Sequence, residues 1–153
     1  MMEFQNLLIE QTPKTPKIDL NHLTGELILS GRSIPENAAK VYEPVLNWVR
    51  EYILKARPIT LLKLDLEYFN TTSSIWLVKI LKVLGQIRDP QYKLVIHLYL
   101  PFEEFNGINE FEDIMHTFSP ITDILKVSIP SVDLILYGKN DKGEIIKTVK
   151  GFI

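Results

Sequence analysis

Two strongly apolar segments with a helix-like segment between them constrain the fold of this chain most. Residues 60–69 (TLLKLDLEYF) and 92–100 (YKLVIHLYL) are rich in apolar side chains and long enough to be central strands of a sheet. Residues 75–87 (IWLVKILKVLGQI) are apolar over most of a helical circumference, which is typical of a helix packed between other elements. A strand, a helix and a strand in this order predict a right-handed crossover that joins two parallel strands.

Further strands are predicted on both sides of this unit. Residues 17–31 indicate two strands around a turn at His22–Gly25, and a short apolar run at residues 6–11 precedes them. Residues 121–129 form another apolar segment. Residues 132–152 indicate a hairpin about Asn140–Gly143.

A second long helix is predicted over residues 33–56. Ser33 and Glu36 have the spacing of a capping box, and Pro35 would lie in the first turn, where its missing N–H is harmless. Pro44 cannot donate a hydrogen bond to Lys40, so the pattern predicts a kink or a restart there. An apolar stripe at helical spacing is formed by Val41, Val45, Trp48, Val49 and Tyr52.

These elements predict a single-domain α/β sandwich. Its mixed sheet would contain antiparallel strands near the N-terminus and the parallel unit of residues 60–100, with helices packed on the sheet. Residues 101–109 are expected to form a loop and residues 109–118 a short amphipathic helix. The 153 residues, of which 46% are hydrophobic, suffice for one core.

Composition argues against several classes of function. The net charge of −2 offers no basic excess for a nucleic-acid partner. No apolar run approaches the roughly 18 residues of a membrane span, and the N-terminus lacks the pattern of a signal peptide, so a cytoplasmic protein without a membrane partner is expected. The absence of cysteine excludes disulfides, a thiolate nucleophile and a cysteine-based metal site.

No catalytic motif is present. His22, His97 and His116 each lack a serine, aspartate or second histidine at the spacing of a triad or a metal site. We therefore expect no enzymatic activity, no cofactor and no metal. The catalytic alternative rests on Asp65 and Glu67, which share one face of a predicted strand and could perform acid–base chemistry with His97.

Four consecutive hydroxyl residues follow the first apolar strand: Thr71, Thr72, Ser73 and Ser74. Functional sites of open α/β sheets lie where such strands end. The next helix begins there with unpaired N–H groups and a positive dipole end, both of which stabilise a phosphoryl group. A helix cap needs only one side chain, such as Asn70, Thr71 or Thr72. The run exceeds that need and indicates a phosphoacceptor or a ligand loop, without distinguishing among the four hydroxyls.

Several segments resemble the SiaC family of bacterial regulatory phosphoproteins. They are IEQTPKTPKIDL (9–20), TGELILSGRSIPEN (24–37), VYEPVLNWVREY (41–52) and LDLEYFNTTSSIWLVKIL (64–81). The most specific parts are Gly31, Ser33, Pro35, Glu36 and Asn37 in one segment and Tyr68 to Thr71 in another. The resemblance covers roughly the first 90 residues.

This resemblance implies a partner-switching protein with a STAS-like fold. In the family, a serine/threonine kinase phosphorylates one threonine and a PP2C-type phosphatase removes the phosphate. The unphosphorylated form binds and activates an output protein, which in the best-known system is a diguanylate cyclase controlling aggregation and biofilm formation. The family's acceptor threonine directly follows the asparagine and corresponds to Thr71.

We expect the partner surface to surround Thr71. Its candidate residues are Glu67, Tyr68, Asn70, Ser33, Pro35, Glu36 and Asn37. Residues 1–128 would form the SiaC-like regulatory domain, and residues 129–153 a C-terminal β-hairpin extension packed on it. The non-enzymatic alternative is a binding or self-association module that uses the apolar surface of this hairpin and has no phospho-switch. The oligomeric state stays open.

Overall fold

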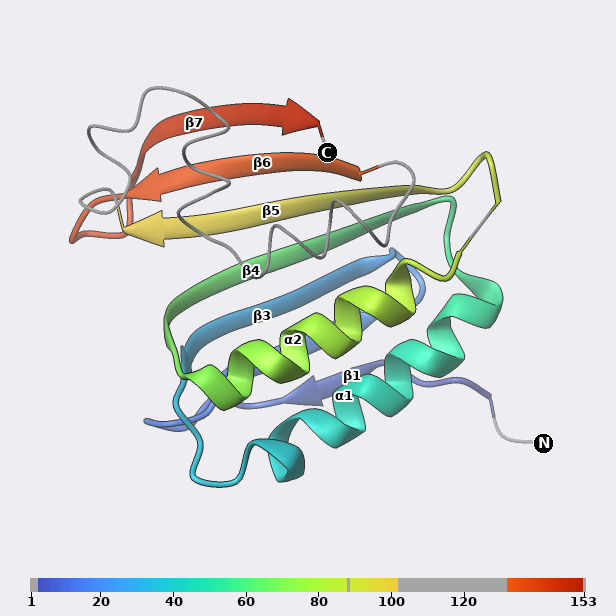
Figure 1. Cartoon of the computed structure of the whole chain (residues 1–153), viewed down its shortest axis with the longest axis horizontal. Coiled ribbons are helices and arrows are strands. Elements are labelled where there is room, and N and C mark those ends of the chain that lie inside the picture. Colours follow the sequence, from blue (N-terminus) through green and yellow to red (C-terminus); the bar gives the residue numbers. More distant parts are fainter. Residues whose placement is uncertain (1–2, 88, 102–131, 153) are drawn as a thin grey trace.

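A single mixed sheet carries two helices on one of its faces (Figure 1). The computed structural model describes residues 3–87, 89–101 and 132–152. The strands within these ranges are β1 (Leu7–Ile9), β2 (Lys17–Asn21), β3 (Glu26–Ser33), β4 (Ile59–Phe69), β5 (Lys93–Pro101), β6 (Val132–Lys139) and β7 (Ile145–Phe152). The helices are α1 (Ala38–Tyr52), the 3-10 turn η1 (Ile53–Lys55) and α2 (Thr71–Leu84).

The strands lie side by side in chain order, from β1 to β7. Strand β2 is antiparallel to both of its neighbours, β1 and β3; β3 to β6 are parallel; and β7 returns antiparallel to β6. The predicted N-terminal antiparallel strands, the parallel pair around α2 and the hairpin at residues 140–143 are therefore confirmed. Since β6 pairs with β5, the hairpin continues the main sheet, and the division into domains at residue 128 stays a prediction.

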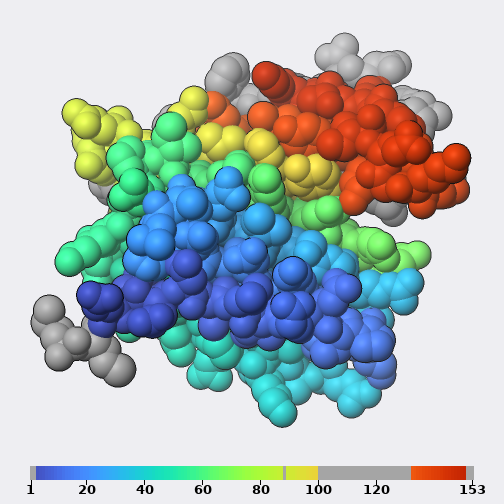
Figure 2. Space-filling view, turned by 180° about the vertical axis from the view of Figure 1, so that it is seen from behind, coloured from blue at the N-terminus to red at the C-terminus, as the bar shows by residue number. Residues whose placement is uncertain are grey.

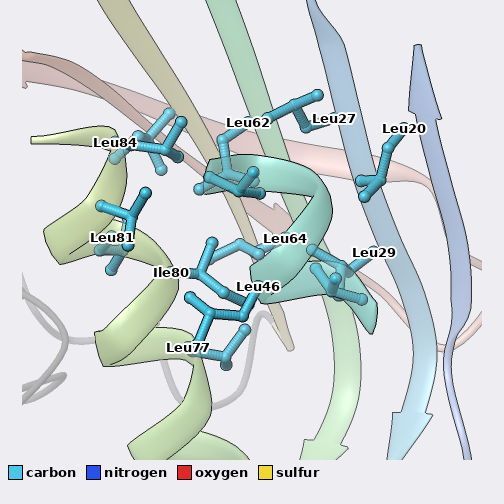
Figure 3. Packing of buried hydrophobic residues seen from close by; sticks show 14 of the residues in the cluster. Leu20, Leu27, Leu29, Leu46, Leu62, Leu64, Leu77, Ile80, Leu81 and Leu84 are labelled. Carbon is cyan, nitrogen blue, oxygen red and sulfur yellow. The ribbon is translucent and has the colours of Figure 1, made fainter. Parts of the chain in front are cut away.

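Alternation along the strands builds the core. In β4, Thr60, Leu62, Leu64 and Leu66 are buried, whereas the residues between them are partly exposed. Figure 3 shows leucines of β3 and β4 near Leu46 of α1 and near the apolar side chains of α2. The buried side of α2 carries Leu77, Ile80, Leu81 and Leu84. The opposite sheet face is not covered by α1 or α2 (Figure 2).

The start of α1 differs from the prediction. The helix begins at Ala38, and the side chain of Asn37 caps it by accepting a hydrogen bond from the Lys40 N–H at 3.3 Å. Ser33 is instead the last residue of β3, where it pairs with Phe69. The predicted capping box is thus wrong, because strand pairing extends through Ser33 and leaves Glu36 in an exposed loop.

Two further helix boundaries differ. Helix α1 continues through the exposed Pro44, so the predicted restart does not occur. The Lys40 carbonyl that loses its donor belongs to an exposed residue, where water can replace that bond. Helix α2 begins at Thr71, so the hydroxyl run forms the first turn of the helix and not a loop before it.

Some expectations concern residues outside the described ranges. They include most of the predicted loop at 101–109, the predicted helix at 109–118 with His116, and the apolar segment at 121–129. Within the described ranges, no helix is long and apolar enough to cross a membrane.

Leu27→Ala should lower the free energy of unfolding by about 2–5 kcal/mol, because Leu27 is fully buried beneath the helices. Leu23→Ala is the matched control, since Leu23 is 64% exposed in the β2–β3 turn. Urea denaturation of both variants checks this expectation. Equal stability of the two variants would contradict the position of the core.

Candidate phosphoacceptor site

The candidate site lies where β3, β4 and α2 meet. Asn70 is the single residue between the end of β4 and the start of α2. Its backbone N–H donates to the Ser33 carbonyl at the end of β3, at 2.9 Å. This edge holds the carboxyl ends of parallel strands, where open α/β sheets place their functional sites.

A β-bulge shapes the ends of both strands. Gly31 pairs with Leu66, but Arg32 pairs with Tyr68, so Glu67 is the extra residue in β4. Gly31 has φ of +101°, a conformation that favours glycine over any other residue. The bulge interrupts the alternation of β4, and Glu67, Tyr68 and Phe69 are all exposed. The glycine of the family motif is therefore explained by backbone geometry.

Two of the four hydroxyls form hydrogen bonds within or next to the first turn of α2. Ser73 is fully buried, and its Oγ lies 2.7 Å from Asn70 Oδ1 and 3.0 Å from the Ser33 carbonyl oxygen. The Ser74 hydroxyl donates to the Asn70 carbonyl at 3.3 Å. Ser73 and Ser74 therefore have structural partners.

The two threonines are both exposed but differ in their partners. The Thr72 hydroxyl donates to Asn70 Oδ1 at 3.1 Å. The Thr71 hydroxyl makes no hydrogen bond to any other residue that the structure describes. Thr71 is the first residue of α2, where the backbone N–H groups have no partner within the helix. Of the four hydroxyls, that of Thr71 is the most available to another molecule.

A buried hydrogen-bond network lies next to the start of α2. Ser33 Oγ lies 2.8 Å from Ser73 Oγ and is also hydrogen-bonded to the hydroxyl of Tyr42 in α1. Tyr42, Ser33 and Ser73 are all fully buried. Burial raises the pKa of Tyr42, although the nearby hydroxyls of Ser33 and Ser73 oppose the shift, so the phenol stays protonated. Sequence reasoning assigned Tyr42 no role, because tyrosine on a helix gives no signal of its hydroxyl's partner.

The predicted surface residues divide into exposed and supporting ones. Glu67 and Tyr68 are exposed, and Arg32 contacts both: its Nε lies 3.5 Å from Glu67 Oε2, and its guanidinium lies 5.5 Å from the Tyr68 ring centroid. Ser33 and Pro35 are buried, so they support the surface from beneath and are not available to a partner.

The remaining predicted residues flank the site. Asn70 is partly buried, and its Nδ2 donates to the Pro35 carbonyl at 3.4 Å. Glu36 is exposed and forms an ion pair with Lys14 at 3.1 Å, while Asn37 caps α1. The amide of Asn70 therefore connects the start of α2 to the loop before α1.

An exposed apolar group lies on these segments, and Tyr68 is its only member that was predicted as a surface residue. The group consists of Ile34, Tyr68, Phe69 and Ile75, which are 38%, 62%, 37% and 50% exposed. We call these four residues the apolar rim. Ile75 lies one helical turn after Thr71 and thus shares its side of α2. Had the helix been predicted to begin at Thr71, this spacing would have revealed Ile75.

The described geometry gives no support to the catalytic alternative. Asp65 is held by Lys139 Nζ at 2.9 Å, and no hydrogen bond or ion pair between described residues joins Asp65 or Glu67 to His97. His97 Nδ1 is buried without a hydrogen-bond partner in the described part of the chain, and burial, with the nearby Lys63 charge, lowers the pKa of His97. The described residues contain no group of three or more potential metal ligands.

The two cap asparagines should differ in their contributions to stability. Asn37→Ala removes one exposed cap bond and should cost about 1 kcal/mol. Asn70→Ala removes a similar cap and also leaves the buried Ser73 hydroxyl without its best acceptor, so it should cost about 2–4 kcal/mol. Thermal or urea unfolding measures both, and equal losses would show that the buried bond contributes nothing.

The chain has relatives in sequence and in structure. The family model described as SiaC family regulatory phosphoprotein matches residues 9–127. An uncharacterised protein of Pseudomonas aeruginosa strain UCBPP-PA14 is 33% identical over 81 residues, which are 53% of this chain and 64% of that protein. The chain thus aligns with less than two thirds of the length of this relative.

Solved structures of SiaC from Pseudomonas aeruginosa share the fold. One is 27% identical with a TM-score of 0.58, covering 62% of this chain and 78% of the other. Apo-SiaC is 22% identical with a TM-score of 0.64, covering 85% and 98%. SiaC in the complex of the diguanylate cyclase SiaD with its activator is 22% identical with a TM-score of 0.64, covering 84% and 97%. With most of its length matched by the family model, the chain belongs to the SiaC family of regulatory phosphoproteins.

Proposed function

We propose that this chain is a partner-switching regulator whose Thr71 hydroxyl is reversibly phosphorylated. One observation carries the proposal: Thr71 is exposed and without a partner among the described residues, whereas Thr72, Ser73 and Ser74 all bond to Asn70. A kinase can approach this hydroxyl without unfolding the helix. The Thr71 oxygen would attack the γ-phosphorus of ATP, ADP would leave, and a base of the kinase would accept the hydroxyl proton.

The position of Thr71 favours a stable phosphorylated state. The backbone N–H groups of Thr71 and Thr72 have no partner within α2, and the helix dipole places partial positive charge at this end, which would stabilise a phosphate. The modification should therefore leave the fold intact and change mainly the surface.

The surface change is large for this chain. A phosphothreonine adds about −1.5 to −2 charges at neutral pH, next to an apolar rim and on a chain of net charge −2. A partner that packs on Ile75 and Tyr68 would have to desolvate that dianion. Such a penalty can reach several kcal/mol, and each 1.4 kcal/mol is about tenfold in affinity.

The proposed partners follow from the family. SiaC is the activator of the diguanylate cyclase SiaD in one related complex, so we propose a diguanylate cyclase as the output protein here. In the cytoplasm, a serine/threonine kinase would add the phosphate and a PP2C-type phosphatase would remove it. Glu67, Tyr68, Glu36 and Asn37 would lie on or beside the surface that the partner contacts.

Phosphate mapping tests the acceptor. The chain purified from its native host should carry phosphate on Thr71 in a fraction of the molecules, read by mass spectrometry. Thr71→Ala should abolish the modification, whereas the matched control Thr72→Ala should retain it. Phosphate confined to Thr72 or Ser74, or absent from residues 71–74 under all growth conditions, would contradict the proposal.

Binding tests the switch. Thr71→Glu should weaken binding to the diguanylate cyclase of the same genome by at least tenfold, and Thr71→Ala should bind as the unphosphorylated protein does. Calorimetric titration measures both. The alternative of self-association through β7, where Ile145 and Ile146 are 50% and 47% exposed, predicts instead that Thr71→Glu changes no binding constant.

A further inference from the structure

A chain of three buried hydroxyls joins α1 to the candidate phosphoacceptor site. It runs from Tyr42 in α1 through Ser33 at the end of β3 to Ser73 in α2, and it ends on Asn70 Oδ1. The three hydroxyl residues have no exposed surface. Buried hydroxyls are costly unless each finds a partner, so the arrangement of their hydrogen atoms is strongly constrained.

The direction of donation follows from counting hydrogen atoms. The backbone N–H of Ser73 donates to the Asn70 side chain at 3.0 Å, so the atom facing it is the amide oxygen, which can only accept. Ser73 Oγ, 2.7 Å from that oxygen, must then be the donor. Because its one hydrogen is used, Ser73 accepts from Ser33, and Ser33 in turn accepts from Tyr42.

The Tyr42 hydroxyl therefore occupies the acceptor site of Ser33 Oγ, while the Ser33 hydrogen is directed to Ser73. The Ser73 hydrogen then has two acceptors, Asn70 Oδ1 at 2.7 Å and, at the longer distance of 3.0 Å, the Ser33 carbonyl oxygen. Without the phenol, Ser33 Oγ becomes a vacant buried acceptor that competes with Asn70 for the Ser73 hydrogen.

We propose that Tyr42 is a positioning residue for phosphorylation. It acts through Ser33 and Ser73 on Asn70, and Asn70 holds the first turn of α2, which presents Thr71. This inference rests on the proposed function for its biological meaning, but its structural part can be measured alone. Loss of the Tyr42 hydroxyl should loosen the start of α2 and reduce Thr71 phosphorylation.

Tyr52 provides a matched control on the same helix. It is also buried, at 1% exposure, and its hydroxyl bonds to the hydroxyl of Thr60 at 2.8 Å. Its hydroxyl also accepts from the Arg57 N–H at 3.2 Å, far along α1 from the acceptor. Tyr42→Phe and Tyr52→Phe thus remove the same atom from similarly buried positions, at two different ends of α1.

The first measurement is amide hydrogen exchange of the ¹⁵N-labelled full chain, followed by NMR. In Tyr42→Phe, the Ser73 and Asn70 amides should exchange about fivefold to tenfold faster relative to the core amide of Leu64. In Tyr52→Phe the same ratio should be unchanged. Ser73→Ala removes the last hydroxyl of the hydrogen-bonded series and should reproduce the Tyr42→Phe pattern. The test can therefore be made with either variant if the other folds poorly. Unchanged exchange ratios in both would overturn the inference.

The second measurement is the phosphate occupancy of Thr71 in the same variants produced in the native host. It should fall at least threefold in Tyr42→Phe, a loss of the size expected for one hydrogen bond, and should stay at the wild-type level in Tyr52→Phe. Equal occupancy in both overturns the positioning role, even if Thr71 is the acceptor. Faster exchange at Ser73 with no phosphate on wild-type Thr71 instead refutes the proposed function and leaves the hydroxyl chain established.

Discussion

The amide oxygen of Asn70 is the acceptor on which the arrangement of this site depends. It receives the backbone N–H and the hydroxyl of Ser73 and the hydroxyl of Thr72. On the other side of the amide, Nδ2 donates to Pro35, and the backbone N–H donates to Ser33. One residue thus joins the end of β4, the first turn of α2, the end of β3 and the loop before α1 through its side chain and its backbone N–H.

The buried hydroxyls explain why this junction is specific. A purely apolar contact between α1, β3 and α2 would tolerate small shifts, whereas hydroxyls that must all be satisfied permit few arrangements. The series of hydrogen bonds from Tyr42 through Ser33 and Ser73 to Asn70 satisfies these hydroxyls, because each hydroxyl donates to the next residue in the series. Thr71 lies outside this network and remains exposed. The Thr71 hydroxyl thus lies beside a hydrogen-bonded junction without a partner among the described residues.

Sequence reasoning predicted the fold well and the site in part. The apolar content and the length of residues 60–69 and 92–100 identified the parallel strands, because strands in the middle of a sheet are rich in apolar side chains. The hydroxyl run indicated a site at the start of α2. Only the hydrogen-bond partners of the four hydroxyls, which the structure provides, distinguished one from another. Ser33 was misassigned as a helix cap, because Ser33 and Glu36 have cap spacing whether or not the helix begins there. Of the apolar rim, Tyr68 was predicted, but Ile34, Phe69 and Ile75 were missed because the rim joins residues from β4, α2 and the loop before α1.

By itself, the sequence determined the approximate positions of the strands and helices in the described ranges, and that hydroxyls and an asparagine follow a central strand. These properties are local, since periodicity and cap preference act within a few residues. Only the tertiary structure decided which hydroxyl is engaged: Ser33 and Ser73 are forty positions apart and meet because β3 and β4 pair in parallel and α2 packs beside α1. Hydrogen-bond partners at such separations depend on packing geometry, and for this reason Ser73 is structural while Thr71 is available.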